Sequence, residues 1–315
     1  MFLICGEALF DLFGEASSGD SLSFDARIGG SPFNVAMGLA RLGEDAAFFG
    51  GISRDALGER LVQKFRTEGV SEDYILRTDH LTTLSVVQKD EHGHPAYTFY
   101  GAGAADRMVT TDDLPDFPEP PLFLHVGSYT ALVDPVATAL KTLIERERPH
   151  TLISFDPNIR PTVVSDMMLW RQNTEAMVPL TDVVKVSDED LELILPGEPV
   201  DEVVRKWLAL GPDLVVVTRG GNGATAYTSD LKIDCPGVRV TVEDTVGAGD
   251  TFQAALLAGL KQLGATGRDR LSGLDETRIN NLLAFAVRAA AVTCSRRGAD
   301  LPRMTELEKE WAALK

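Results

Sequence analysis

The chain has 315 residues, with 30 lysines and arginines against 47 aspartates and glutamates, which gives a formal net charge of −17 at pH 7. That charge disfavours binding to nucleic acids and to anionic membrane surfaces, because both are polyanions. No apolar run is long enough to cross a membrane. With 44% hydrophobic and 24% charged residues, the composition is typical of a globular protein with a large core.

The three cysteines, Cys5, Cys235 and Cys294, lie far apart and form no Cys-x-x-Cys pair. An odd number of separated cysteines disfavours a disulfide framework and a zinc site, and is typical of reduced thiols. The first residues, MFLICGEALFDLF, lack the basic segment and the cleavage site of a secretory signal. We therefore expect a cytoplasmic protein.

The N-terminal part of the chain begins with a strand-like segment and continues with a helix-like one. Residues 1–5 (MFLIC) predict a buried strand. Residues 31–43 predict a helix, in which we expect Ser31 to be the N-cap, Pro32 to lie in the first turn and Gly43 to mark the end.

The same alternation continues along the chain. Residues 46–51 (AAFFGG) predict a strand, and residues 55–69 predict a helix. One face of that helix carries the apolar residues Leu57, Leu61, Val62 and Phe65. Further strands are predicted at 121–127, 151–156, 182–187 and 213–221, and further helices at 135–147 and 200–211. Continuous apolar strands between helices indicate a parallel sheet covered on both faces, with ligands beyond the carboxyl ends of its strands.

Residues 9–28 and 83–101 break this pattern, because each shows strand-like alternation with turn residues but no helix follows. Residues 90–93 (DEHG) predict a hairpin turn inside the second segment. We expect a small second sheet that acts as a lid; the alternative is that these strands lie at the edge of the main sheet. The domain division is then a core of residues 1–8, 29–82 and 102–315, with a lid of residues 9–28 and 83–101.

The segment DTVGAGDTF (244–252) places small residues between two aspartates. The residues after it predict an amphipathic helix that ends at Gly264, so residues 247–249 form a helix N-terminus. Free N–H groups and the helix dipole favour an anion there. The segment is not a Walker A loop, because no Gly-Lys-Ser/Thr follows.

Asp250 lies in the first turn of that helix, where a carboxylate would repel a static phosphate. A general base explains it better, because it can take a proton from an attacking hydroxyl while the loop amides stabilise a transferred phosphoryl group. From the residues alone, the alternative is a carboxylate favoured by the helix dipole, with glycines that serve close packing.

Three segments, 29–43, 48–58 and 244–259, resemble the two signatures of the ribokinase-like (PfkB) carbohydrate kinases. The order of GEALFD, FDPNIR, VKVSDEDLELI and VTRGGNGA along the chain is similar to that family too, so the resemblance covers nearly the whole chain. Ser53 departs from the family pattern, which usually has a glycine there. We expect no loss of function, because the residue stays small.

The resemblance implies an α/β protein with a three-layer α/β/α core, a mainly parallel sheet and a small β-sheet lid. It also implies ATP-dependent transfer of the γ-phosphoryl group to a sugar hydroxyl. Asp250 matches the catalytic base of the family, and the amides of Gly247, Ala248 and Gly249 match its anion hole.

The resemblance also implies a set of substrate-binding residues. The positions that match residues holding sugar hydroxyls are Asp11, Gly29, Gly30 and Asn34. Tyr100 on the lid strand and Arg160 in FDPNIR are further candidates for contact with the substrate or its phosphate. Without the resemblance, Asp11 would be a solvated strand end and Arg160 a surface ion pair.

The positions that match nucleotide-binding residues are Lys185, Ser187, Thr218, Gly220, Gly223 and Gly249. Ser187 and Asp190 stand where many members carry Asn-x-x-Glu, so Asp190 or the neighbouring Glu189 is expected to hold Mg²⁺ through water. Without the resemblance, Glu189 and Asp190 would belong to an acidic helix N-terminus, and Gly220 and Gly223 would be the glycines of a hairpin turn. Asp244 matches a carboxylate of a monovalent-cation loop, which adds K⁺ to the expectations.

GEALFD, DPNIR and VKVSDEDLE are most similar to the fructokinase and 2-keto-3-deoxygluconate kinase branch. Members of that branch often carry Tyr-Arg on the lid strand, where the arginine can pair with a substrate carboxylate, but this chain has Tyr100-Gly101. The missing cation favours a neutral ketose, fructose first, although Arg107 and Arg160 could compensate. The alternatives are 2-keto-3-deoxygluconate and another sugar or nucleoside of the same family.

Two rivals come from other classes of protein. A non-catalytic sugar or nucleotide sensor on the same fold is disfavoured by the intact GAGD sequence. A dinucleotide-dependent oxidoreductase would need G-x-G-x-x-G after the first strand, where this chain has GEALFD. The expected partner is a small sugar, with no nucleic acid and no membrane, and the lid sheet could also pair with a second copy in a homodimer.

Overall fold

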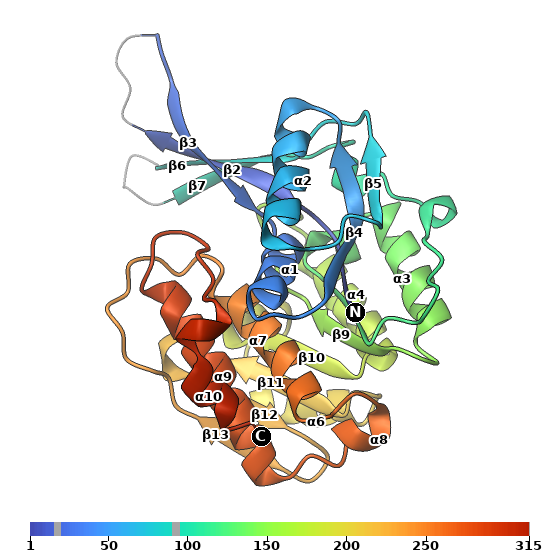
Figure 1. The fold of residues 1–315 in the computed structure, drawn as a ribbon, viewed down its shortest axis with the longest axis vertical. Coiled ribbons are helices and arrows are strands. Elements are labelled where there is room, and N and C mark those ends of the chain that lie inside the picture. Colours follow the sequence, from blue (N-terminus) through green and yellow to red (C-terminus); the bar gives the residue numbers. More distant parts are fainter. Residues whose placement is uncertain (16–19, 90–94, 315) are drawn as a thin grey trace.

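A computed structural model describes residues 1–15, 20–89 and 95–314 of the chain. The strands of its large sheet are β1 (Phe2–Cys5), β4 (Ala46–Ser53), β5 (Ile75–Thr78), β8 (Phe123–Gly127), β9 (Leu152–Asp156), β10 (Val183–Ser187), β11 (Leu214–Thr218), β12 (Ala224–Tyr227) and β13 (Lys232–Cys235). They lie in the order β13-β12-β11-β10-β9-β8-β1-β4-β5 (Figure 1). Neighbours from β5 to β11 are parallel, and β12 and β13 add antiparallel strands at one edge. The prediction of a mainly parallel sheet is confirmed.

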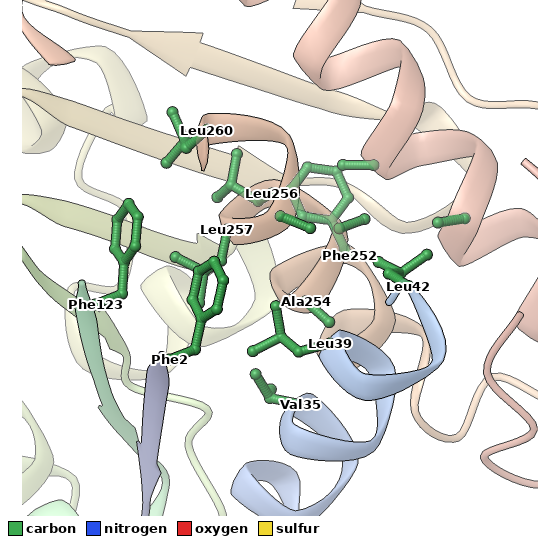
Figure 2. Packing of buried hydrophobic residues seen from close by; sticks show 14 of the residues in the cluster. Phe2, Val35, Leu39, Leu42, Phe123, Phe252, Ala254, Leu256, Leu257 and Leu260 are labelled. Atoms are coloured by element: carbon green, nitrogen blue, oxygen red, sulfur yellow. The ribbon is translucent and has the colours of Figure 1, made fainter. Parts of the chain in front are cut away.

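Helices cover both faces of this sheet. They are α1 (Ser31–Arg41), α2 (Ala56–Glu68), α3 (Val136–Glu147), α4 (Met167–Met177), α5 (Asp188–Ile194), α6 (Val200–Leu208), α7 (Ala248–Gln262), α8 (Arg268–Leu271), α9 (Glu276–Cys294) and α10 (Glu308–Ala312). Phe2 and Ile4 of β1 pack with α1, α2, α7 and α9. Leu3 and Cys5, which alternate with them along the strand, pack with α3. This alternation follows from the period of a strand, and it gives the expected three layers. Figure 2 shows the first face, where Phe2 lies beside residues of α7.

The N-cap of helix α1 lies one residue earlier than the sequence predicts. The N-cap is Gly30, with φ of 107°, and Ser31 is the first helical residue, so the prediction of Ser31 as N-cap is wrong. The physical reason is that the Ser31 hydroxyl donates to the Asp250 carboxylate and does not accept a hydrogen bond from a backbone N–H of its own helix, as an N-cap side chain would. Pro32 lies in the first turn, and Gly43 follows the last turn with φ of 81°, as predicted.

A second, smaller sheet projects from the main body of the molecule (Figure 1). Its strands are β2 (Leu9–Glu15), β3 (Ser23–Gly29), β6 (Leu84–Lys89) and β7 (Pro95–Tyr100), in the order β3-β2-β6-β7. The prediction of a second sheet is confirmed, and its strands are not edge strands of the large sheet. Strands β6 and β7 are antiparallel; the turn predicted at 90–93 lies outside the described residues.

Cross-strand pairing defines the face of the small sheet on which Asp11 lies. Arg27 of β3 is opposite Asp11, Asp11 is opposite Ser85 of β6, and Ser85 is opposite Phe99 of β7. Directly opposite residues share a face, so these four side chains form one row across the sheet. Phe10 and Ile28 are paired on the other face.

Two buried acids lie where the chain passes between the two sheets. Glu7 follows β1, and the Thr130 hydroxyl donates to its Oε2 at 2.8 Å. Asp106 follows β7, and accepts from the Thr83 hydroxyl on Oδ1 and from the Tyr129 hydroxyl on Oδ2. We call these five residues the neck cluster. It connects the entry and exit segments of the small sheet to the main body.

Within the described ranges, none of the helices has the length and apolar character that a membrane-spanning helix needs.

Candidate active site

The N-terminus of α7 presents a short loop of small residues. Gly247 is the N-cap in the left-handed conformation, with φ of 78°, and Ala248 and Gly249 form the first turn. The first amide groups of a helix have no partner inside it, which makes such an end favourable for an anion. The Ala248 N–H nevertheless donates to the Thr245 carbonyl at 3.2 Å, so among the described residues it is the Gly247 and Gly249 N–H groups that remain available, and not that of Ala248 as expected. A Cβ on Gly247 would lie 2.6 Å from the Ala299 Cβ, so both the backbone conformation and the space require glycine there.

The Asp250 carboxylate lies one turn into α7 and is largely buried. The Ser31 hydroxyl donates to its Oδ1 at 2.6 Å, and the Asn34 amide donates to its Oδ2 at 2.7 Å. Burial raises the pKa of Asp250, while these two donors and the positive charges of Lys185 and Arg160 act in the opposite direction. A carboxylate with a raised pKa is a stronger base than an exposed one, provided that it is ionised.

A buried cation lies next to the loop. Lys185 of β10 donates to Asp156 Oδ2 at 2.7 Å, and both side chains are almost fully buried. A Cβ on Gly249 would lie 3.1 Å from the Lys185 Nζ, so the ammonium group is adjacent to the first turn of α7. Burial favours the neutral form of Lys185, but the charges of Asp156, Asp190 and Asp250 outweigh it and raise the lysine pKa.

Asp190 is buried beside this ion pair. Ser187 is the N-cap of α5 and accepts from the Asp190 backbone N–H at 3.0 Å, while Asp190 Oδ1 accepts from the Ile159 backbone N–H at 3.0 Å. Burial and the negative charge of Asp156 raise the Asp190 pKa. Glu189, the other sequence candidate for a metal ligand, is exposed.

The small sheet contributes Asp11. Burial raises the pKa of Asp11, opposed by a hydrogen bond with Ser85 and by the charge of Arg160. A Cβ on Gly29 would lie 2.3 Å from Asp11 Oδ2, so this glycine leaves room for the carboxylate. Arg160 also lowers the pKa of Asp190 and of Asp250. The Arg160 side chain is exposed and donates to the Ile159 carbonyl at 2.9 Å, and its charge reaches all three carboxylates.

Several of the other candidates lie apart from this cluster. Tyr100 is 61% exposed at the end of β7. Thr218 is paired with Ser187 at the carboxyl ends of β10 and β11, which places it on the same edge of the sheet. Gly220 lies in the turn after β11, and a Cβ on Gly223 would lie 2.1 Å from the Cys235 carbonyl oxygen, so close packing between chain segments explains that glycine.

Asp244 joins two loops. Its Oδ1 accepts from the Val246 backbone N–H at 3.1 Å, and its Oδ2 accepts from the Gly298 backbone N–H at 2.8 Å. The carboxylate therefore fixes the segment that leads into α7 against the segment that follows α9.

Three residues of the cluster are missing from the sequence predictions. Asp156 ends a buried strand, which is a signal that could have found it, because polar residues at the carboxyl ends of parallel strands face the ligand edge. The sequence pattern predicts Ser31 only as a helix N-cap, and Ser85 only as one residue of an alternating strand. For these two residues no local signal exists, since their partners Asp250 and Asp11 are distant in the chain.

Comparisons with known proteins identify the family of this chain. The sequence matches the family described as pfkB family carbohydrate kinase over residues 3–306. It is 39% identical to a fructokinase of Rhizobium leguminosarum bv. trifolii over 282 residues, which cover 89% of this chain and 86% of the relative.

Two solved structures are similar over almost their whole length. A fructokinase of Xylella fastidiosa with bound ATP has a TM-score of 0.88 and 27% identity, over 98% of this chain and 97% of that one. A fructokinase of Vibrio cholerae O395 in its fructose, ADP and calcium ion bound form has a TM-score of 0.81 and 29% identity, over 100% of this chain and 98% of that one.

Proposed function

This chain belongs to the pfkB family of carbohydrate kinases, and we propose that it transfers the γ-phosphoryl group of ATP to a hydroxyl of fructose. The observation that carries this proposal is the position of Asp250. A buried carboxylate with a raised pKa lies in the first turn of α7, beside the glycine amides of the loop and close to the Lys185 ammonium group. The fructokinase relatives support the choice of sugar.

In this mechanism the sugar lies between Asp11 of the small sheet and Asp250 of α7. Asp250 takes the proton from the attacking hydroxyl. Ser31 and Asn34 hold the Asp250 carboxylate in place, and each of its oxygens keeps a further lone pair that can accept. The amides of Gly247 and Gly249 stabilise the charge that develops on the transferred group. Lys185 adds a fixed positive charge on the same side.

The donor set fits a hydrated divalent cation, and we assign Mg²⁺ to it. Among the described residues, Asp156 Oδ1 is buried without a hydrogen-bond partner, and the negative charge of Asp156 raises the pKa of the nearby Asp190 carboxyl. Carboxylates that act through water suit Mg²⁺, which when bound neutralises charge on the phosphates of ATP. A monovalent ion such as K⁺ is assigned to the loop that Asp244 fixes.

A second candidate substrate is 2-keto-3-deoxygluconate, and one observation favours it. A Cβ on Gly101 would lie 3.0 Å from an Arg107 nitrogen, and the Arg107 guanidinium lies over the rings of Phe99 and Tyr129 at 5.2 and 5.0 Å. Arg107 is therefore a cation beside Gly101. It lies near Phe99, the residue at one end of the Asp11 row. Such a cation could pair with a substrate carboxylate.

We also propose that the small sheet is a lid that covers the sugar, and that its exposed surface pairs with a second copy of the chain. The support for the first role is that Asp11 and Ser85 lie on one face of that sheet. Strands β3 and β7 are the edges of the small sheet, and the outward N–H and C=O groups of an edge strand can pair with another strand, which supports the dimer. Size-exclusion chromatography with light scattering tests the dimer.

The Asp250→Asn variant tests the mechanism. The amide keeps the shape of the side chain but cannot accept a proton, so we expect kcat to fall by about 10²–10⁴-fold with ATP binding unchanged. ADP release measures kcat, and titration calorimetry measures ATP binding. Asp230→Asn is the control, because Asp230 is an exposed carboxylate in the turn between β12 and β13. Near-native turnover in Asp250→Asn would show that the base is elsewhere.

A substrate panel of fructose, 2-keto-3-deoxygluconate, ribose and adenosine tests the sugar. We expect the largest kcat/KM with fructose. If 2-keto-3-deoxygluconate is preferred and Arg107→Met removes that preference, the second candidate is correct. ATP or sugar binding without ADP release on any member of the panel would instead indicate a non-catalytic sensor.

A further inference from the structure

A groove of about 680 Å³ lies beside the candidate active site. One wall is α1, with Asn34 and Arg41, and a second is α2, where Arg60 and Lys64 are one turn apart on a single helix face. The edge strand β3 with Arg27 and the segment 297–301 complete it. The volume is in the range of small-molecule sites.

The groove is basic in a protein that is strongly acidic. Its lining includes five cationic side chains and one acidic one, Asp300; the five are Arg27, Arg41, Arg60, Lys64 and Arg297. The chain as a whole has a net charge of −17, so the gathering of cations here is a local feature of the fold.

Some of these cations are paired with acidic side chains, and others have N–H groups that remain available to a ligand. Arg41 is fully engaged by Glu68, Asp300 and the Leu301 carbonyl, and Lys64 donates to Glu68 at 2.7 Å. Among the described residues, Arg60 makes no hydrogen bond or ion pair. Arg297 is 75% exposed and reaches Asp25 only at 3.6 Å. Arg60 and Arg297 can therefore donate to a ligand.

The groove is distinct from the site around Asp250. Asp11, Arg160, Lys185 and Asp250 do not line it, and its small-sheet residues include Phe10 and Ile28, which lie on the face opposite to Asp11. The two sites meet at Arg27, which lines the groove and lies in the Asp11 row, and at two further places. Asn34 lines the groove and donates to Asp250, and Ala299 lines the groove and contacts Gly247.

We propose that this groove binds a small phosphate-bearing molecule and that its occupancy affects the catalytic base through Asn34. Guanidinium groups match the geometry of a phosphate, and the apolar floor that Phe33 and Met37 provide suits the rest of a sugar or nucleotide. The source of the phosphate is one of three: a phosphorylated sugar, a nucleotide or inorganic phosphate. The effect on the base rests on the proposed function, whereas the binding does not.

Titration calorimetry on the full chain tests binding without turnover. Fructose 6-phosphate, ADP and inorganic phosphate are titrated separately, each with and without a non-hydrolysable ATP analogue in the catalytic site. We expect one of the three to bind in the presence of the analogue, with an affinity that falls as the salt concentration rises. If none of them binds under that condition, the groove is not a ligand site.

The variant Arg60→Gln, alone and with Arg297→Gln, locates the binding. We expect the affinity to fall by about tenfold for each lost guanidinium contact, with kcat/KM for the sugar unchanged when no effector is present. Arg66→Gln is the matched control, because Arg66 is on the same helix, pairs with Glu72 and does not line the groove. An equal loss in the control would show that the attraction is not local and would overturn the site. Thermal unfolding of each variant verifies the fold.

The regulatory part is tested by kcat of the wild-type enzyme with the bound phosphate compound present and absent. We expect kcat to change in the wild-type protein and to stay constant in the double variant. If the compound binds in the groove but leaves kcat and KM unchanged, the coupling through Asn34 is refuted while the site stands. If no sugar is phosphorylated at all, the proposed function fails and the binding result is unaffected.

Discussion

Two clusters of buried carboxylates in this molecule differ in what compensates their charge. At the candidate active site, Asp156, Asp190 and Asp250 surround Lys185, with Arg160 near them. In the neck cluster, Glu7 and Asp106 are held mainly by hydroxyl groups, although the Arg107 charge also reaches Asp106.

The difference separates a reactive site from a structural one. Asp106 uses both oxygens on internal donors, Thr83 and Tyr129. Among the described residues, one buried oxygen of Asp156 and the Gly247 and Gly249 amides at the start of α7 have no hydrogen-bond partner. A cluster balanced by cations, with groups left over, can accept a ligand. A cluster closed by hydroxyl groups can only stabilise the fold or destabilise it as its charge changes.

The largest effect is expected for Lys185→Met. Removal of the ammonium group leaves Asp156 charged and buried, so we expect a loss of about 3–5 kcal/mol in the free energy of unfolding. The fixed charge beside the loop is lost as well, so we expect kcat to fall by about 10²–10³-fold. Denaturant unfolding and ADP release, both well below the melting temperature, measure the two effects.

Lys206→Met is the control for this variant, since Lys206 forms an exposed ion pair with Glu198. It should change both quantities little. If Lys185→Met retains native activity and loses only stability, Lys185 belongs with the structural cluster and the contrast between the two clusters disappears.

A smaller effect, on stability alone, is expected for Glu7→Gln. Burial raises the pKa of Glu7 from an ordinary 4.5 to about 7, so the folded protein binds a proton that the unfolded chain has lost between these two values. The wild-type protein therefore loses stability as the pH rises from 4.5 to 7, by about 3 kcal/mol, and the glutamine variant does not. Relative to wild type, Glu7→Gln should gain stability over this window and keep the gain above pH 7.

Urea unfolding at pH 4.5, 6 and 8 measures this dependence. Glu202→Gln, an exposed glutamate on α6, is the control and should follow the wild-type curve. A constant difference between Glu7→Gln and wild type at all three pH values would mean that Glu7 does not titrate as its burial requires.

The smallest effect is expected for Ser31→Ala. The Ser31 hydroxyl orients Asp250 and stabilises its ionised form, so its loss should lower kcat by about tenfold. The Asp250 pKa should rise further, which moves the acid limb of the kcat–pH profile to higher pH. Ser71→Ala, which removes a hydroxyl from the surface carboxylate Asp73, should leave the profile in place. A lower kcat with an unmoved acid limb would assign Ser31 a purely structural role.

The sequence predicted the fold well where local patterns decide the structure. The apolar run in β10, the helix face of α2 and the alternation in residues 9–28 each determine an element without help from distant residues. The start of α7 was predicted for the same reason, since the small residues at 247–249 and the helical pattern after them are adjacent in the chain.

The rest depends on contacts between distant segments. Ser31 looks like a helix cap, but its partner Asp250 is 219 residues away, and the pair exists only once α1 and α7 pack together. Glu7 and Thr130 are 123 residues apart, so no pattern near either one predicts the neck cluster. The groove is assembled from separate segments of the chain in the same way.

Asn34 takes part in two sites, because its amide donates to the proposed catalytic base Asp250 and the residue lines the groove. Selection acting on this position cannot adjust one property and spare the other. Evolutionary divergence among enzymes of this kind has more freedom on α2, where Arg60 and Lys64 line the groove and, within the described part of the chain, form no hydrogen bond with Asp250. Directed evolution of effector response should therefore begin with libraries at those two positions and keep Asn34 constant.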